Sequence, residues 1–398
     1  MKILVVNAGS STLKFQLMNT ETSKVVAKGN VERINEGKSF LRYKANGKET
    51  IINEDIKTHK RAIELVMQYL TDKELGVVKS VDEIDAFGHR FVNAGENYFD
   101  PCIITEDALK DFRNSIDFAP IHIPGSIAGI EACMAVCPNT PNCAVFDIGF
   151  HKHIPEYAYR YAIPKKYYDE YRVRRFGFHG ASHYYVTNKC AELMGKDVKD
   201  IKIITCHLGS GASISAVKDG HSVDTSMGFT PLEGIMMNTR SGDLDPAIVE
   251  FICKKENKSV SEVLTMLNKQ SGLIGANGVC SDMREILENI SNPDVKLSLD
   301  MYNYRIKKYI GAYSAVLGGV DAIVFTAGVG EHTPEVREAV TDNMEYLGIK
   351  VDHDLNWNAP RGEICEISAK DSKVKVYIIP TDEEYVIAKE TEKLIQNK

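Results

Sequence analysis

The feature of this sequence that most constrains its fold is a local pattern that occurs twice. Each copy has a short apolar run, a loop of small residues and a second run with alternating apolar and polar side chains. The copies begin at Ile3 and Ile201, and their loops cover residues 7–11 and 207–211. Such runs predict β-strands. Repetition of a strand–loop–strand unit predicts two related domains.

The rest of the chain predicts a mixed α/β fold. Expected strands cover residues 25–31, 84–87, 322–325 and 374–379, and expected helices cover residues 62–70, 306–317 and 384–395. Gly318 and Gly319 end the second of these helices. Thr333 and Pro334 predict the start of a further helix, after a glycine loop at residues 326–330. Strands mixed with helices in this way indicate α/β layers.

Composition excludes several classes of function. The 398 residues can bury more than one core. A net charge of −7 leaves no overall basic face for nucleic-acid phosphates, so no nucleic-acid partner is expected. No apolar stretch has the length of a membrane span or of a signal-peptide core, so no membrane partner is expected. Nine cysteines, an odd number spread along the chain, favour a reducing cytoplasm over a disulfide framework.

One group of cysteines and histidines leaves a zinc site as an alternative. Cys133 and Cys137 are followed by Cys143, His151 and His153. The cysteines lack the close spacing that is typical of zinc sites. Because Cys133 and Cys137 fit one apolar helix face, buried thiols are the favoured interpretation.

Three glycine-bearing loops indicate phosphate binding. They lie at residues 7–14, 207–211 and 328–331. Backbone N–H groups in such loops can bind phosphate oxygens. The first lacks the Gly-Lys-Ser/Thr ending of a P-loop, and the third lacks the spacing of a dinucleotide-binding loop. Together they predict a nucleotide held from both sides.

Charged and histidine side chains accompany these loops. Arg90 and Arg240 have the planar, forked donors that suit carboxylate and phosphate, although each could equally lie on the surface. Asp147 follows a predicted strand, where α/β enzymes assemble their sites. His179 and His207 stand beside small residues, and a lone histidine of this kind is more often structural than catalytic.

A series of motifs in order along nearly the whole chain resembles the acetate kinase family. The motifs are N-A-G-S-S-x-L-K-F, G-H-R, F-D-x-x-F-H, F-G-F-H-G-x-S-H, H-L-G-x-G, D-T-S-M-G-F-T-P-L-E-G, T-R-x-G-D-x-D-P, S-D-M-R, T-A-G-V-G-E and I-P-T-D-E-E. The resemblance implies two duplicated actin-like ATPase domains with a ribonuclease H-like core and an active site in the cleft between them. The expected domains are residues 1–150 with 384–398, and residues 151–383. A homodimer is also implied.

The resemblance assigns the matching residues to four groups. The magnesium ligands would be Asn7 and Glu383, with Mn²⁺ as an alternative ion. ATP or ADP would be bound by Lys14, His207, Leu208, Gly209, Ser210, Gly211, Asp282, Met283, Arg284, Gly328, Val329, Gly330, Glu331 and His332. The carboxylate substrate would contact Arg90, Val92, Ile121, His122, Phe178 and Pro231. The catalytic residues would be Asp147, His179 and Arg240.

The chain departs from the family's pattern at a few positions. Ser210 replaces the usual Asn near the phosphates. Asn93 and Ala94 follow Arg90 and also differ from the family. Ile123, Ile148 and Gly149 lie in two segments beside the expected acyl pocket and put its chain-length preference in question.

The expected reaction is reversible, direct in-line transfer of the ATP γ-phosphoryl group to acetate. A carboxylate is already ionised at neutral pH, so Asp147 is expected to orient other groups instead of removing a proton. Propionate kinase is the close alternative, because one methylene discriminates by only about 1–3 kcal/mol. A sugar kinase would need polar residues and a base facing a hydroxyl. A non-enzymatic, ATP-switched protein resembling actin or Hsp70 is the alternative from another functional class.

Overall fold

The computed structural model describes residues 1–120 and 122–397. The chain divides into two compact units. Unit 1 comprises Met1–Gly149 and Asp382–Lys398, and unit 2 comprises Phe150–Thr381. The chain therefore crosses from one unit to the other twice.

In the described part of unit 1, an eight-stranded sheet has the order β5-β4-β3-β2-β1-β6-β8-β7. Its strands are β1 (Lys2–Ala8), β2 (Leu13–Asn19), β3 (Lys24–Glu32), β4 (Phe40–Ala45), β5 (Lys48–Asn53), β6 (Ala86–Phe91), β7 (Cys102–Ile103) and β8 (Asn142–Phe146). Strand β1 is antiparallel to β2 and parallel to β6, which is parallel to β8.

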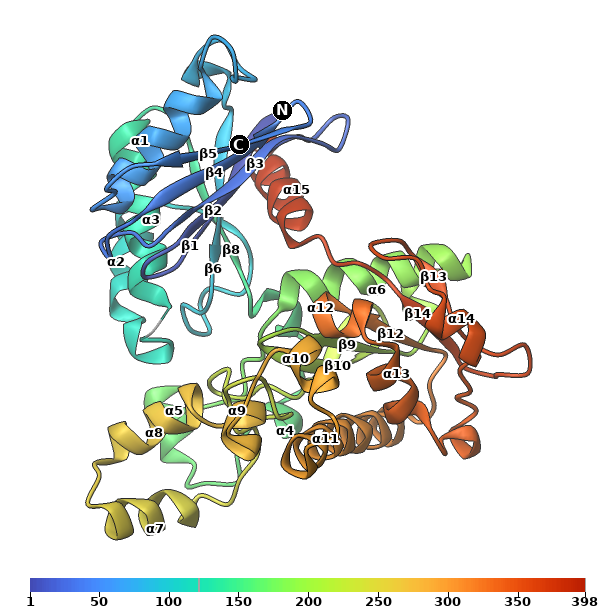
Figure 1. Ribbon diagram of the computed structural model, residues 1–398. Coiled ribbons are helices and arrows are strands. Elements are labelled where there is room, and N and C mark those ends of the chain that lie inside the picture. The colour runs from blue at the N-terminus through green and yellow to red at the C-terminus, as the bar shows by residue number, and fades with distance from the viewer. Residues whose placement is uncertain (121, 398) are drawn as a thin grey trace. The chain divides into compact units, whose positions relative to one another are not determined.

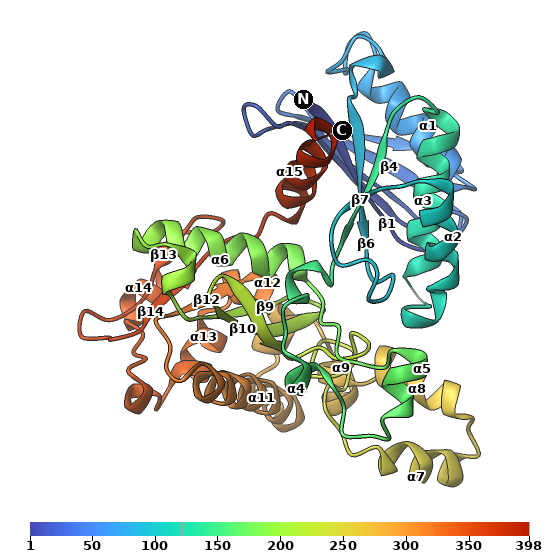
Figure 2. The same ribbon diagram turned by 180° about the vertical axis from the view of Figure 1, so that it is seen from behind.

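Helices cover both faces of the sheet in unit 1. The helices α1 (His59–Leu70), α2 (Glu106–Asn114) and α3 (Ile123–Val136) lie on one face, and α15 (Glu383–Gln396) lies on the other (Figures 1 and 2). Leu4 and Val6 join the core under α1 and α3, whereas Ile3 and Val5 join the core under α15. Strand β1 is therefore apolar on both sides, as a central strand between two helical layers must be.

In the described part of unit 2, a six-stranded sheet has the order β11-β10-β9-β12-β14-β13. Its strands are β9 (Ile203–Leu208), β10 (Ala212–Lys218), β11 (His221–Thr225), β12 (Ala322–Thr326), β13 (Cys365–Glu366) and β14 (Lys375–Ile378). The helix α6 (Gly180–Met194) packs on β9 and β12, and α11 (Pro293–Leu317) packs on β9 and β10. These two helices lie on opposite faces of the sheet (Figure 1).

Unit 2 contains further helices. They are α4 (Glu156–Tyr159), α5 (Lys166–Tyr171), α7 (Ala247–Glu256), α8 (Val260–Lys269), α9 (Gly272–Asn277), α10 (Met283–Glu288), α12 (Ala327–His332), α13 (Pro334–Thr341) and α14 (His353–Trp357). Within residues 1–120 and 122–397, no helix combines the length and the apolar character that crossing a membrane requires.

The two units share one sheet topology. The order β3-β2-β1-β6-β8 in unit 1 corresponds to β11-β10-β9-β12-β14 in unit 2, with three antiparallel strands followed by two parallel ones. The pairings of unit 2 have the same directions. The prediction of two duplicated α/β domains from the repeated strand–loop–strand pattern is therefore confirmed.

Two local predictions were wrong in detail. Gly88, His89 and Arg90 lie inside β6 and do not follow a strand. The expected glycine loop at residues 326–330 contains the start of α12, because Ala327 turns the chain directly from β12 into a helix. The second strand of the first repeat, β2, is confirmed; α15 packs against Met18 on it, and Lys14 is its one exposed residue.

Cys133, Cys137 and Cys143 are buried free thiols. Cys133 and Cys137 pack among the apolar side chains beneath α1 and α3, which confirms the favoured interpretation. Burial raises the pKa of the Cys133 thiol well above its ordinary value. Among the described residues, no group of three or more His, Cys, Asp or Glu side chains is arranged to hold a metal ion.

Candidate functional site

The first loop of unit 1 is held rigidly between two strands and two helices. Asn7 and Lys14 are direct partners across the β1–β2 hairpin. The Gly9 carbonyl accepts a hydrogen bond of 2.8 Å from His59 Nε2 on α1. A Cβ at Gly125 on α3 would lie 2.5 Å from the Gly9 carbonyl carbon, so only glycine permits this packing. The hairpin therefore presents Asn7 and Lys14 on a fixed backbone.

Arg90 and Asp147 form an ion pair at the end of the central strands of unit 1. Arg90 Nε donates to Asp147 Oδ1 at 2.8 Å, and Nη2 donates to Oδ2 at 2.6 Å. Burial acts to lower the pKa of Arg90, but the charges of Asp147 and Glu383 outweigh it and the pKa is raised. Among the described residues, no hydrogen bond uses Arg90 Nη1. This nitrogen remains as a donor for a ligand.

Glu383 begins α15 close to this ion pair. Its neighbour Asp382 caps the helix by accepting a hydrogen bond from Tyr385 N at 2.9 Å. Burial is the main reason that the pKa of Glu383 rises from 4.5 to about 6, and the charge of Asp147 adds to it. Arg90 and Lys14 act in the opposite direction. A cation beside Glu383 would stabilise its charged form.

The oxygen atoms of unit 1 fit a hard divalent cation. The Glu383 carboxylate and the Asn7 amide oxygen are ligand types that magnesium prefers. Because these are only two protein groups, such an ion would complete its shell with water or substrate phosphates, as is usual for magnesium.

Two histidines of unit 2 are stacked, and a serine holds each of them. The rings of His179 and His207 lie 4.1 Å apart with an interplanar angle of 20°. His179 Nδ1 is 2.8 Å from Ser213 Oγ, and His207 Nδ1 is 2.7 Å from Ser182 Oγ. His179 has a φ of 57°, a left-handed conformation that costs free energy in a non-glycine residue and often marks a functional site.

His179 and Arg240 converge at Gly211. A Cβ at Gly211 would lie 3.5 Å from His179 Nε2 and 3.4 Å from Arg240 Nη1. Arg240 Nη1 also donates to the Pro231 carbonyl at 3.2 Å. Burial lowers the pKa of the Arg240 guanidinium. The absence of a side chain at Gly211 thus leaves space where an imidazole and a guanidinium face the same point.

The other two glycine segments of unit 2 pack against each other. Ala327 has a φ of 64°, so the chain makes a strained turn from β12 into α12. A Cβ at Gly209 would lie 3.7 Å from the Ala327 Cβ. The buried guanidinium of Arg337 donates from Nη1 to the carbonyls of Gly330 (2.9 Å) and Glu331 (3.0 Å). Arg337 therefore fixes the end of α12.

Some predicted site residues are not joined to this group. Asp282 caps α10 and forms an exposed ion pair with Arg284. Among the described residues, no hydrogen bond joins this pair to the other glycine segments. Phe178 is buried, Val92 is partly buried and His122 precedes α3. Ile121 lies outside the described residues.

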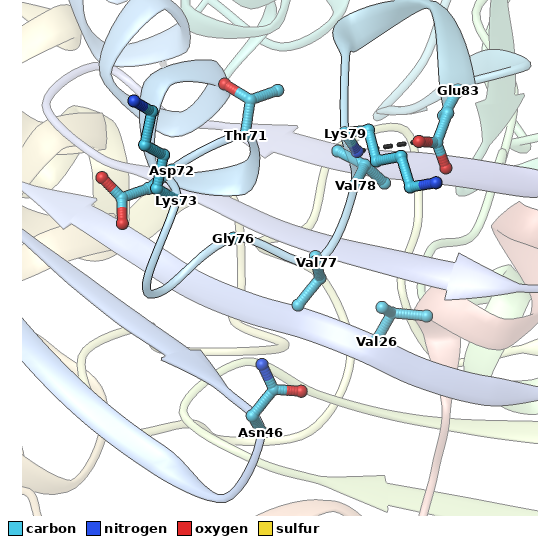
Figure 3. Close-up of a pocket in the computed structure, with 10 residues that line it drawn as sticks. All are labelled: Val26, Asn46, Thr71, Asp72, Lys73, Gly76, Val77, Val78, Lys79 and Glu83. Carbon is cyan, nitrogen blue, oxygen red and sulfur yellow. Dashed lines mark hydrogen bonds between the residues drawn. The ribbon is translucent and has the colours of Figure 1, made fainter.

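Two pockets of unit 1 are separate from its predicted site residues. One pocket of about 670 Å³ lies beside the turn after α1 (Figure 3). It is lined by Val26, Asn46, Thr71, Asp72, Lys73, Gly76, Val77, Val78, Lys79 and Glu83. Another, of about 460 Å³, borders the first loop at Ser10 and His59. Neither contains a residue that the sequence assigned to the site.

The sequence did not assign a role to several residues that support the site. Ser213, Ser182 and His183 contact the stacked histidines or their partners, and Arg337 holds α12. Ser182 and His183 belong to the motif F-G-F-H-G-x-S-H, so their spacing from His179 was a usable signal. Ser213 and Arg337 carried no comparable signal, because their partners are distant in sequence.

Comparison with known proteins gives a consistent family. The acetokinase family model matches residues 2–389. The chain is 50% identical over 398 residues to acetate kinase of Caldicellulosiruptor saccharolyticus, with 100% of both chains covered. It is 52% identical over 400 residues to acetate kinase of Caldanaerobacter subterraneus subsp. tengcongensis, covering 100% of this chain and 99% of the relative.

Solved structures agree with this result. The crystal structure of Porphyromonas gingivalis acetate kinase has a TM-score of 0.94 and 42% identity, with 99% of each chain covered. A propionate kinase from Francisella tularensis has a TM-score of 0.92 and 36% identity, also with 99% of each chain covered. The full-length matches in sequence and in structure show that this chain belongs to the acetokinase family.

Proposed function

We propose that this chain catalyses reversible transfer of the γ-phosphoryl group between ATP and acetate, giving acetyl phosphate and ADP. Family membership supports phosphotransfer to a carboxyl group. The observation that carries the proposal is the convergence of His179 Nε2 and Arg240 Nη1 at Gly211, beside the glycine segments of unit 2.

Arg90 is the proposed ligand of the acetate carboxylate. Its Nε and Nη2 are engaged by Asp147, so Nη1 is the donor that would face the substrate. A guanidinium held by a carboxylate keeps its orientation, and this lowers the entropy cost of binding an anion. Asp147 would therefore act through Arg90 and not as a base.

The nucleotide would be bound by the glycine segments of unit 2 together with Lys14 of unit 1. Backbone N–H groups near Gly209 and Gly330 suit phosphate oxygens. Asn7 and Glu383 would hold Mg²⁺, which neutralises phosphate charge when bound. Mn²⁺ has similar ligand preferences and is the alternative ion.

Transfer would be direct and in line. An acetate oxygen forms a bond to the γ-phosphorus while the bond from that phosphorus to the bridging oxygen of ADP breaks. No proton needs to be removed, because the carboxylate is already ionised. Arg90, Arg240 and Lys14 offset the repulsion between the two anions, and His179 with Arg240 would bind the phosphoryl oxygens during transfer.

Acetate is favoured over propionate by the named relatives. Both curated relatives described above are acetate kinases at about half identity, whereas the propionate kinase structure is 36% identical. Val92, Phe178 and Pro231 are the apolar residues proposed to surround the methyl group.

The proposed assembly is a homodimer in the cytoplasm. Two copies of one chain would form it, as the family resemblance implies. Support for a reducing compartment comes from the cysteines, which are all free thiols in the structure.

The experiment that tests this function traps the product. The protein is incubated with Mg-ATP, with and without acetate, and hydroxylamine converts any acetyl phosphate into a hydroxamate. Acetate-dependent hydroxamate, and ATP formation from acetyl phosphate and ADP, are the expected results. ATP hydrolysis that is independent of acetate would overturn the proposal.

A further inference from the structure

A continuous chain of buried polar groups leads to His179 from inside unit 2. His183 lies one turn further along α6 and is fully buried. Its Nδ1 is 2.7 Å from Thr205 Oγ1, and its Nε2 is 2.7 Å from Ser213 Oγ. The same Ser213 oxygen is 2.8 Å from His179 Nδ1. Thr205 and Ser213 come from the neighbouring strands β9 and β10.

The hydrogens available to this chain restrict its arrangement. Burial, and then the rings of His151 and His207, hold the pKa of His183 well below its ordinary value. A neutral imidazole has one N–H donor and one bare nitrogen. Ser213 has a single hydroxyl hydrogen for two ring nitrogens. The hydrogen bonds must therefore all run in one direction along the chain.

Thr205 sets that direction. Among residues 1–120 and 122–397, the only acceptor that the Thr205 hydroxyl reaches is His183 Nδ1. A buried hydroxyl that donates to nothing is costly, so Thr205 donates to Nδ1. His183 then carries its hydrogen on Nε2 and donates to Ser213. Ser213 in turn donates to His179 Nδ1.

We propose that Ser213 is a positioning residue that holds His179 as a neutral imidazole with its hydrogen on Nε2. That nitrogen faces the space at Gly211, beside Arg240 Nη1. In this form His179 donates a hydrogen bond and cannot accept a phosphoryl group at Nε2. The proposal rests on the proposed function for the acceptor, which would be an oxygen of the phosphoryl group in transfer.

Two histidines and an arginine lie near the His179 ring. The ring of His207 is stacked on it, Arg240 lies beside the same glycine and His183 follows on α6. A positive charge on His179 would be repelled by the Arg240 guanidinium. An imidazole that stays neutral can still donate from Nε2, and its position is fixed before the substrates bind.

The test uses three variants and one matched control. Ser213→Ala removes the link to His179. Thr205→Val removes the first hydroxyl at nearly constant volume, and Thr205→Ser retains it. Ser215→Ala is the control, because Ser215 is also buried on β10 but its hydroxyl contacts Ser222 Oγ (2.9 Å) and the Asp224 carbonyl (3.1 Å).

The first measurement is ¹⁵N NMR of the histidine rings, with the His179 signals identified by their loss in His179→Gln. In the natural protein near neutral pH, hydrogen on Nε2 and a bare Nδ1 are expected. Ser213→Ala is expected to show a mixture of the two tautomers, and Ser215→Ala the natural pattern. This measurement needs no activity, so it stands even if the proposed function fails.

The second measurement is the rate of acetyl phosphate formation. Ser213→Ala and Thr205→Val are expected to lower kcat by on the order of tenfold, the effect of one lost hydrogen bond on a barrier. KM for ATP should stay unchanged, and Thr205→Ser should restore kcat. A general loss of packing would not be rescued by Thr205→Ser.

Two results would overturn the proposal. One is a bare Nε2 on His179 in the natural protein. The other is a Ser213→Ala protein that matches Ser215→Ala in both measurements. If Ser213→Ala does not fold, the Thr205→Val and Thr205→Ser pair decides the question alone, since the direction of the hydrogen bonds starts at Thr205. A natural protein that forms no acyl phosphate would instead overturn the proposed function.

Discussion

The carboxylate of Asp147 engages two of the three nitrogens of the Arg90 guanidinium, with Nε–Oδ1 and Nη2–Oδ2 distances of 2.8 and 2.6 Å. Asp147 is 4% exposed and the Arg90 side chain is 24% exposed, so the carboxylate is shielded from water and salt more than the guanidinium is. A bidentate pair of this kind fixes the plane of the guanidinium as well as its position. The remaining Nη1 is thereby aimed by a residue that need not touch the substrate.

We predict that Asp147→Asn raises KM for acetate by about tenfold or more, because a partly buried guanidinium loses its charged partner and its fixed orientation. Steady-state kinetics with acetate as the varied substrate check this. The matched control is Glu131→Gln, which breaks an exposed ion pair of the same 2.6 Å length to Arg113 and should change nothing. If Asp147→Asn kept natural turnover and KM while Arg90→Gln failed, Asp147 would be dispensable.

The raised pKa of Glu383 predicts that the substitution Glu383→Gln has opposite effects on stability and on activity. Its pKa in the folded protein is raised from 4.5 to about 6, so its stabilising contribution is present below pH 4.5 and is lost as the pH rises through about 6. Above that pH, the charged carboxylate costs about 1–2 kcal/mol of unfolding free energy. Glu383→Gln should therefore melt at a higher temperature than the natural protein at pH 8, and at the same temperature at low pH.

The same substitution should abolish magnesium-dependent activity, because a carboxamide is a much weaker ligand for the ion. Thermal unfolding in EDTA across the pH range, and phosphoryl transfer with added Mg²⁺, separate the two effects. If Glu383→Gln is less stable than the natural protein at pH 8 in EDTA, the charged carboxylate of Glu383 does not destabilise the folded protein.

Gly211 gives a prediction about the space between His179 and Arg240. In Gly211→Ala the new Cβ makes ordinary contacts of 3.4–3.5 Å, so the protein should fold normally. The methyl group would fill the space assigned to a phosphoryl oxygen, and kcat should fall by on the order of a hundredfold. Natural kcat in Gly211→Ala would place the transferred group elsewhere.

The control for Gly211→Ala is Gly311→Ala. Gly311 lies inside α11, and a Cβ there would meet nothing within 4 Å. Alanine in a helix interior is expected to add about 0.5–1 kcal/mol of stability and to leave kcat unchanged. Urea unfolding and kinetics of both variants complete the comparison.

The contacts of Arg337 predict that its substitution weakens nucleotide binding selectively. Arg337→Gln removes donors to the carbonyls of Gly330 and Glu331, which should lower the unfolding free energy by about 1–3 kcal/mol. KM for ATP should rise while KM for acetate stays the same. Arg61→Gln, which breaks an exposed pair with Glu54, serves as the control. Equal increases in both KM values would indicate a global defect.

The sequence predicted the duplicated fold because both copies of the pattern are local. The runs that begin at Ile3 and Ile201 have the apolar strand, small loop and alternating strand within a few residues of one another. The burial of individual strand residues and the bounds of the strands were harder to predict. The burial of Met18 depends on α15, which comes from the other end of the chain. Gly88–Arg90 became part of a strand because β6 is paired on both sides.

The candidate site was predictable where a motif carries the chemistry. Arg90 and Asp147 were named separately from the sequence, and their ion pair needed two strands that lie side by side in the sheet. The support for His179 was not predictable from spacing. Ser213 reaches it only because β10 pairs with β9 under α6, so a hydroxyl that looks like an ordinary strand residue becomes the link between two imidazoles.

The most direct test of the account measures kcat/KM for acetate, propionate and butyrate in parallel, with Mg-ATP as donor and the acyl phosphate trapped as hydroxamate. We predict the highest value for acetate and a decrease with each added methylene of about 1–3 kcal/mol in transition-state free energy. A preference for propionate would contradict acetate as the preferred substrate but would still support phosphotransferase activity toward a carboxylate. No acyl phosphate from any acid, in a folded protein that binds ATP, would contradict the account itself.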